Sequence, residues 1–224
     1  MKHRAARFAL AAGMLLFGPL PSFAQLSWES PQLLGPGSPA GVSILFVNYG
    51  LDPNPGLGGT VIWRTATAPR GFALRGSVAQ GIGNKLNYAG GIDLSSTLMR
   101  ASSEFPFSLM WTYGAGASYG EYLEVALPIG VAGGRTIASS KMRFSPYTGA
   151  RGVLEGRIGS AAPGRDLGVG FAIDLGADLA FGQNRDFAIR LAASIGDRHA
   201  AAIGVHFGGG TSAVSAQRAP ISRR

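Results

Sequence analysis

Histidine, aspartate and serine are the residues of this chain that could form a catalytic site. His206, placed beside Asp174 or Asp178 and a serine, would have the parts of a hydrolase site. The simpler interpretation is a structural histidine that bonds to a carboxylate. Asp174 and Asp178 are about 13 Å apart along an extended strand, at ~3.3 Å per residue, which is too far for a carboxylate dyad. We therefore predict no catalytic residues and no enzyme activity.

Metal and phosphate chemistry also lack the residues they need. His199 and His206 are seven positions apart, and no carboxylates can be placed beside both. The chain has no cysteine, which excludes thiolate metal sites and disulfides. The glycine-rich stretches 56–59 and 81–83 lack the following helix and the Gly-Lys-Ser/Thr of a phosphate loop. We predict neither a metal nor a cofactor.

The clearest pattern in the chain is a two-residue alternation over 167–181. Every odd-numbered position is apolar, from Leu167 to Phe181, whereas the even-numbered positions are Gly, Ala or Asp. Successive residues of a strand point to opposite faces, so this strand has one wholly apolar face. Glycine and aspartate on the other face suit a crowded polar interior.

Similar alternation elsewhere in the chain predicts further antiparallel strands. A barrel with both chain ends in the periplasm needs an even number of them. Ten strands are expected, at 41–49, 60–67, 72–78, 86–98, 107–119, 123–131, 141–153, 167–181, 187–195 and 201–207. Eight would result if the first pair lay outside the ring, because Ile44 to Val47 are all apolar and blur the alternation. Pro128 cannot donate to a strand ladder, so a bulge is expected there.

Charged residues collect on the faces opposite the apolar ones. If the apolar faces meet lipid, the inward faces carry Arg64, Arg75, Arg143, Arg151 and Arg190, together with Asp93, Glu124, Asp174, Asp178 and His206. Buried charges are tolerable when they are paired, and the planar arginine group suits carboxylates. We predict an ion-pair network that fills a narrow lumen, with the glycines of 167–181 leaving room for arginines.

A solvated face of a soluble sheet is the alternative for these charges. Such faces usually carry lysine, but beyond the N-terminal segment the chain has only Lys85 and Lys141, both at expected turns. A periplasmic lipocalin-like barrel is a further alternative, and it would turn the apolar faces inward around a ligand.

Residues 1–24 have the layout of a secretory signal peptide: a basic start, an apolar run over 8–20, and Ser22-Phe23-Ala24 before Gln25. The run is shorter than the ~20 residues of a spanning helix. The segment 25–40 carries three prolines without periodicity and is expected to be an irregular leader on the periplasmic side. The barrel would cover 41–208, and the polar tail 209–224 would be disordered.

The positive charge is concentrated at the two ends of the chain. Of the formal +8, three charges belong to residues 1–24 and three to Arg218, Arg223 and Arg224, which leaves +2 on 25–217. We therefore predict no nucleic-acid partner.

Together these features resemble small outer-membrane β-barrel proteins of the OmpA transmembrane-domain type. The resemblance covers about 40–208 and rests on Ser22-Phe23-Ala24 before Gln25, on the dyad repeat of 171–179, and on the closing strand 201–207. It implies an all-β, antiparallel up-and-down transmembrane barrel in the outer membrane of a Gram-negative cell, with lipid and the barrel-assembly machinery as partners. That family commonly ends on an aromatic residue, whereas 17 residues follow Phe207 here.

The leading functional hypothesis is a structural or surface protein with a narrow or plugged lumen and no catalysis. A small pore or transporter for small solutes is the alternative, and the two differ in whether the charged side chains close the lumen. An outer-membrane lipid hydrolase using His206 is a third hypothesis.

Overall fold

The computed structural model describes residues 31–49, 56–65, 68–80, 86–120, 122–140, 142–158, 167–181, 186–197 and 199–208. These residues form the strands β1 (Gly41–Tyr49), β2 (Gly56–Arg64), β3 (Arg70–Gln80), β4 (Leu86–Met99), β5 (Ser108–Tyr119), β6 (Leu123–Gly134), β7 (Ile137–Ala138), β8 (Met142–Ile158), β9 (Leu167–Phe181), β10 (Phe187–Gly196) and β11 (Ala200–Phe207).

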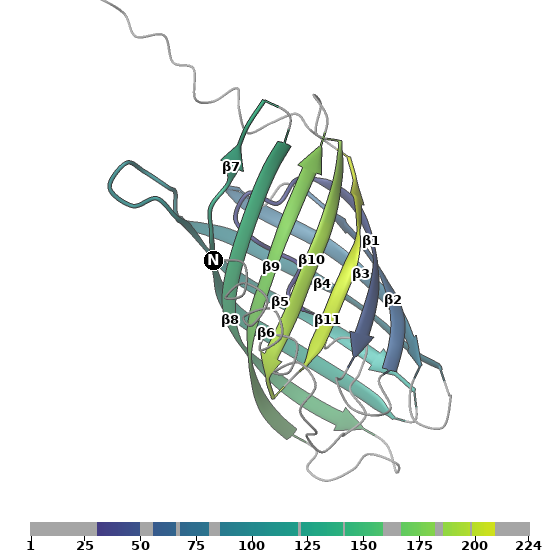
Figure 1. Cartoon of the computed structure of the whole chain (residues 1–224). Coiled ribbons are helices and arrows are strands. Elements are labelled where there is room, and N and C mark those ends of the chain that lie inside the picture. The colour runs from purple at the N-terminus through teal and green to yellow at the C-terminus, as the bar shows by residue number, and fades with distance from the viewer. Residues whose placement is uncertain are drawn as a thin grey trace, which may run out of the picture.

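The ten longer strands form a closed antiparallel barrel (Figure 1). Each pairs with its neighbours along the chain, β6 pairs with β8, and β1 pairs with β11 to complete the ring. This confirms the predicted ten-stranded up-and-down barrel. The eight-stranded alternative is wrong, because β1 lies in the ring between β2 and β11. The short strand β7, which was not predicted, pairs only with the start of β8.

The apolar face of each strand points to the outside of the barrel. On β9, Phe171 is 65% exposed whereas Asp174 is 0% exposed. The same holds around the ring, where the exposed apolar side chains include Ile44, Phe46, Val61, Trp63, Leu74, Val78, Tyr88, Ile92, Trp111, Tyr113, Leu127, Ile129, Leu154, Val169, Ile173, Leu191 and Ile203. The lipocalin-like arrangement, with apolar faces inward, is therefore wrong.

The blurred alternation of β1 has a structural cause. Ile44 and Phe46 are exposed on the outside, whereas Leu45 and Val47 point inward and are buried. The inner wall here is thus apolar rather than polar. Its buried cluster contains Leu45, Val47, Tyr49, Ile62, Ala73, Ala79, Ala192 and Ala202, together with Leu33 from the segment before β1.

The bulge predicted at Pro128 is not present. Pro128 pairs with Val153 of β8 in unbroken register. On its other side, the pairs that flank it, Tyr113 with Ile129 and Gly116 with Ala126, also share one register. Gly114, at the level of Pro128 on β5, leaves room for the proline ring, since a Cβ there would lie 3.3 Å from its Cγ. A missing side chain therefore accommodates the proline without a bulge.

Candidate functional site: the filled lumen

A two-pronged ion pair joins Arg190 of β10 to Asp178 of β9, which are direct cross-strand partners. Nε and Nη2 of Arg190 each donate to one oxygen of Asp178, both at 2.8 Å. Nη1 donates to Oγ of Ser43 on β1 at 2.9 Å. Both charged groups are buried in the lumen, which we define as the space enclosed by the inward faces of the ten barrel strands. Paired and bidentate, they satisfy each other where water is excluded.

A second pair lies farther along β9. Nε of Arg151 lies 2.8 Å from Oδ2 of Asp174. Ser194 of β10 completes a triangle, since it donates to Asp174 Oδ1 at 2.8 Å and accepts from Arg151 Nη2 at 3.1 Å. The two aspartates that the alternation of 167–181 singled out therefore each hold a different arginine.

Two further groups of charges line the remaining wall. On β3 and β4, Nη2 of Arg75 lies 2.9 Å from Oδ2 of Asp93. Near the other end of the barrel, Arg157 donates to Glu124 at 3.0 Å and to Glu155 at 3.4 Å.

Glu155 and Arg157 were missed because β8 was predicted to end at residue 153, whereas it continues to Ile158. The signal was present in the sequence. Odd-numbered positions face the lumen along β8, so extending the strand by four residues adds Glu155 and Arg157 to the set that includes Arg151.

Three of the predicted lumenal residues lie outside these pairs. Arg143 is half-buried near the start of β8. Arg64, at the end of β2, is fully buried, and none of its guanidinium nitrogens has a hydrogen-bond partner among the described residues. Nδ1 of His206 lies 3.0 Å from Oγ of Ser43. Among the described residues, Ser43 rather than a carboxylate therefore lies beside this nitrogen.

The segment 31–40 lies inside the lumen. The backbone N–H of Gln32 donates to Asp174 at 3.0 Å, and the Ser38 hydroxyl donates to Asp178 at 3.3 Å. The hydroxyl of Tyr147, on β8, donates to the Gln32 carbonyl at 3.0 Å. The irregular conformation of this segment was expected from its prolines, but its position among the ion pairs was not.

Two adjacent leucines pack the segment against different parts of the wall. Leu33, 1% exposed, joins the apolar cluster of β1, β2, β3, β10 and β11. Leu34, 3% exposed, contacts Met110 of β5 and Ala132 of β6. Because successive residues reach separate walls, the segment fills the lumen from side to side.

The ring of Tyr147 packs between two glycines, one in the segment 31–40 and one on β9. A Cβ on Gly35 of the segment would lie 2.6 Å from the Tyr147 ring, and a Cβ on Gly176 of β9 would overlap that ring. The tyrosine ring therefore lies between two backbones that only glycine allows to approach. The glycines of 167–181 were expected to leave room for arginines, but Gly176 makes room for Tyr147 instead.

Replacing Gly176 by valine tests this arrangement. The new side chain must displace the Tyr147 ring, so we expect a loss of about 1–3 kcal/mol in unfolding free energy, as for overpacked cores, and faster proteolysis of the segment 31–40. Gly76→Val is the matched control, because a Cβ there meets nothing within 4 Å. Equal behaviour of the two variants would show that Tyr147 does not depend on Gly176.

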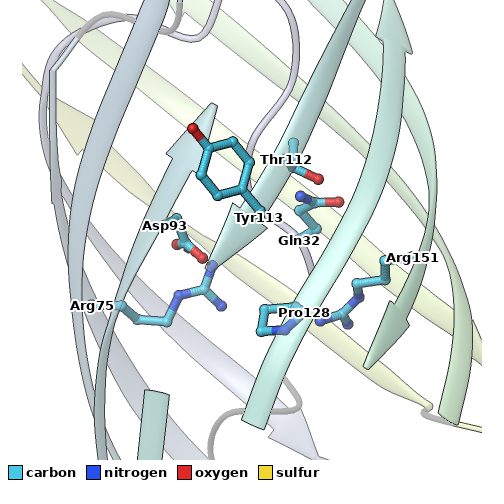
Figure 2. Close-up of a pocket in the computed structure, with 7 residues that line it drawn as sticks. All are labelled: Gln32, Arg75, Asp93, Thr112, Tyr113, Pro128 and Arg151. Carbon is cyan, nitrogen blue, oxygen red and sulfur yellow. Dashed lines mark hydrogen bonds and ion pairs between the residues drawn. The ribbon is translucent and has the colours of Figure 1, made fainter. Parts of the chain in front are cut away.

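A small cavity beside the segment is lined by Arg75 and Asp93 on one side and Arg151 on the other, with Gln32, Thr112, Tyr113 and Pro128 around it (Figure 2). The space that the centre of a water molecule can reach in it is about 10 Å³, which is enough for about one water. This part of the lumen is therefore closed to solutes in the described conformation.

Among the residues that the structure describes, no group of three or more histidine, cysteine or acidic side chains could hold a metal ion. The described residues also form no helix that is long and apolar enough to cross a membrane.

No protein-family model and no curated protein matches this chain. Among solved structures it is similar to a KdgM porin in complex with disordered oligogalacturonate, at 10% identity over 75% of this chain and 99% of that chain, with a TM-score of 0.38. A KdgM porin is similar at 11% identity, with the same coverage and a TM-score of 0.34. Both are similarities of fold, with low TM-scores and low sequence identity. The closed barrel itself is established by the strand pairing, whereas the resemblance to the OmpA type remains a prediction.

Proposed function

We propose that this chain is an integral outer-membrane β-barrel whose lumen is closed by its own segment 31–40, with a structural or surface role and without catalysis. The observation that carries the proposal is the placement of Leu33 and Leu34 against separate walls of the lumen. The ion pairs of Asp174 and Asp178 with their arginines fill the space around them.

The outer surface supports a position in lipid. Apolar side chains cover it, and aromatic pairs lie at the barrel end where β1 begins, including Trp63 with Phe72 and Phe187 with Phe207. On β9, Phe171 and Phe181 are ten residues apart, or about 33 Å along the strand at ~3.3 Å per residue. At a tilt of about 40° this spans about 25 Å of height, the usual thickness of the apolar band of such barrels.

A charge placed midway along this band tests the membrane position. Leu175→Arg, on the exposed face of β9, is expected to cost about 2–4 kcal/mol of folding free energy in lipid vesicles. Leu167→Arg, at the end of the same strand face, should cost at most about 1 kcal/mol. Equal costs, or a mature protein that stays in the soluble fraction without detergent, would contradict the proposal.

The remaining parts of this proposal concern export and assembly. Residues 1–24 would be removed as a signal peptide, and the closing strand with Phe207 would be recognised by the barrel-assembly machinery. The first part rests on the sequence pattern of residues 1–24, and the second on the sequence of the closing strand and its pairing with β1.

A small pore for small solutes is the second candidate. It is favoured by the way the segment is held, through hydrogen bonds and apolar contacts rather than as a strand of the ring. Such a segment can leave the lumen without breaking the barrel. Conductance with and without it separates the two functions.

A further inference from the structure

One arginine in the lumen has no carboxylate left to pair with. On the inward faces of the described strands, each of the acidic residues already lies in an ion pair: Asp93, Glu124, Glu155, Asp174 and Asp178. Arg64 lies outside all of these pairs. Its three nitrogens are buried and have no hydrogen-bond partner among the described residues.

A histidine lies nearby. Nε2 of His206 is also buried and lacks a well-formed hydrogen bond among the described residues, although the Ala40 backbone interacts with the imidazole. Arg64 is the cross-strand partner of Gly41, and His206 is the partner of Ser43, so the two side chains flank the start of β1 from either side. They are close enough to interact electrostatically. At one end of the lumen, the three donor nitrogens of Arg64 thus lack partners, beside an imidazole nitrogen of His206 that makes no hydrogen bond to a side chain.

Asp178 and Asp93 act on Arg64 through their charges, but neither gives it a hydrogen bond. A buried guanidinium group without hydrogen bonds is unfavourable, and it cannot lose its charge as a lysine can. The planar group binds the oxygens of carboxylates, phosphates and sulfates through two parallel hydrogen bonds. The segment 31–40 covers this place, because Leu33 packs with Ile62 and Ala73, which lie beside Arg64 along β2 and across from it on β3.

We infer that a small oxyanion binds between Arg64 and His206 and helps to hold the segment 31–40 in the lumen. The inference deepens the proposed closure and rests on it. Two sources can supply such a negatively charged oxygen group. One is a free anion, and the other is the carboxylate of Glu29, which precedes the segment and lies outside the described residues. We assign it to a free anion, and the experiment separates the two.

The test uses the purified mature chain in neutral detergent and follows its thermal unfolding by circular dichroism. Phosphate or sulfate is titrated at constant ionic strength against chloride. We expect the wild-type midpoint to rise by about 5–10 °C when the anion is about 100-fold above its Kd. Arg64→Gln should lose this rise, and His206→Gln should weaken the anion about tenfold. Arg100→Gln, an exposed arginine in the β4–β5 connection, should respond as the wild type does.

Three outcomes would overturn the inference. A rise that persists in Arg64→Gln means an adventitious ion only. A response that is absent from the wild type and appears in Glu29→Gln means that the chain supplies its own carboxylate. No response in either protein means that Arg64 needs no anion. If Arg64→Gln does not fold, Arg64→Lys keeps the charge without the planar group, and its expected result is a weaker response. The readout needs no membrane, so its failure is distinct from failure of the proposed membrane barrel.

Discussion

Deleting residues 31–40 is expected to turn a silent barrel into a conducting one. In planar bilayers the mature wild type should show no single-channel steps, because Leu33 and Leu34 fill the lumen from wall to wall. Without the segment, the hydrogen bonds from Gln32 to Asp174 and from Ser38 to Asp178 are lost, and the space that the segment occupied fills with water. Discrete conductance steps should then appear.

Deletion of ten residues from the tail, 215–224, is the matched control for length. It should leave the barrel silent. Silence of both deletions would mean that the ion pairs close the lumen alone, and the segment would have no part in closure. Steps in the intact chain would contradict closure and would favour the pore function instead.

Replacing Arg190 by methionine is expected to cost about 3–5 kcal/mol of unfolding free energy. The change leaves Asp178 as a buried charge and removes the donor to Ser43. Urea unfolding of the barrel in lipid vesicles measures this cost. Arg100→Met, at an exposed position, should change stability by no more than about 0.5 kcal/mol.

A second variant separates the loss of a pair from the loss of a side chain. In Arg190→Met with Asp178→Leu, both charges are gone, so most of the lost stability should return, as it does when a buried pair is replaced by apolar residues. A cost for Arg190→Met within about 1 kcal/mol of the exposed control would show that this pair does not stabilise the lumen.

The barrel could be predicted from local pattern because its strands repeat with a period of two. On β9 the alternation alone separates the lipid-facing residues, such as Phe171, from inward ones such as Asp174. Extending the same parity by four residues on β8 would have found Glu155 and Arg157. These predictions need only the geometry of a single strand.

The filling of the lumen could not be predicted in this way. Leu33 and Leu34 are two isolated apolar residues among prolines, and nothing in their neighbourhood shows that they pack against walls distant in the sequence. Gly176 has a role only because Tyr147 of the neighbouring strand crosses to the segment. Pro128 avoids a bulge only because Gly114 lies at its level. In each case the reason is a tertiary contact.

The two proposed functions share one structure and differ in whether the segment 31–40 stays in the lumen. A permanently closed barrel presents only its loops to the cell exterior or the periplasm. A barrel with a removable segment would admit solutes past Arg75 and Arg151, which line the cavity beside the segment (Figure 2). The lumen charges are present in both cases. What decides between them is whether the segment 31–40 leaves.

The most direct test of the closed lumen is the reactivity of a single thiol at position 34. The chain has no cysteine, so Leu34→Cys and Ser103→Cys each carry one thiol. In lipid vesicles, a water-soluble maleimide should label position 34 at least about 100-fold more slowly than exposed position 103, because labelling must wait for local opening. Labelling of both positions at the same rate would place the segment outside the lumen and contradict the account.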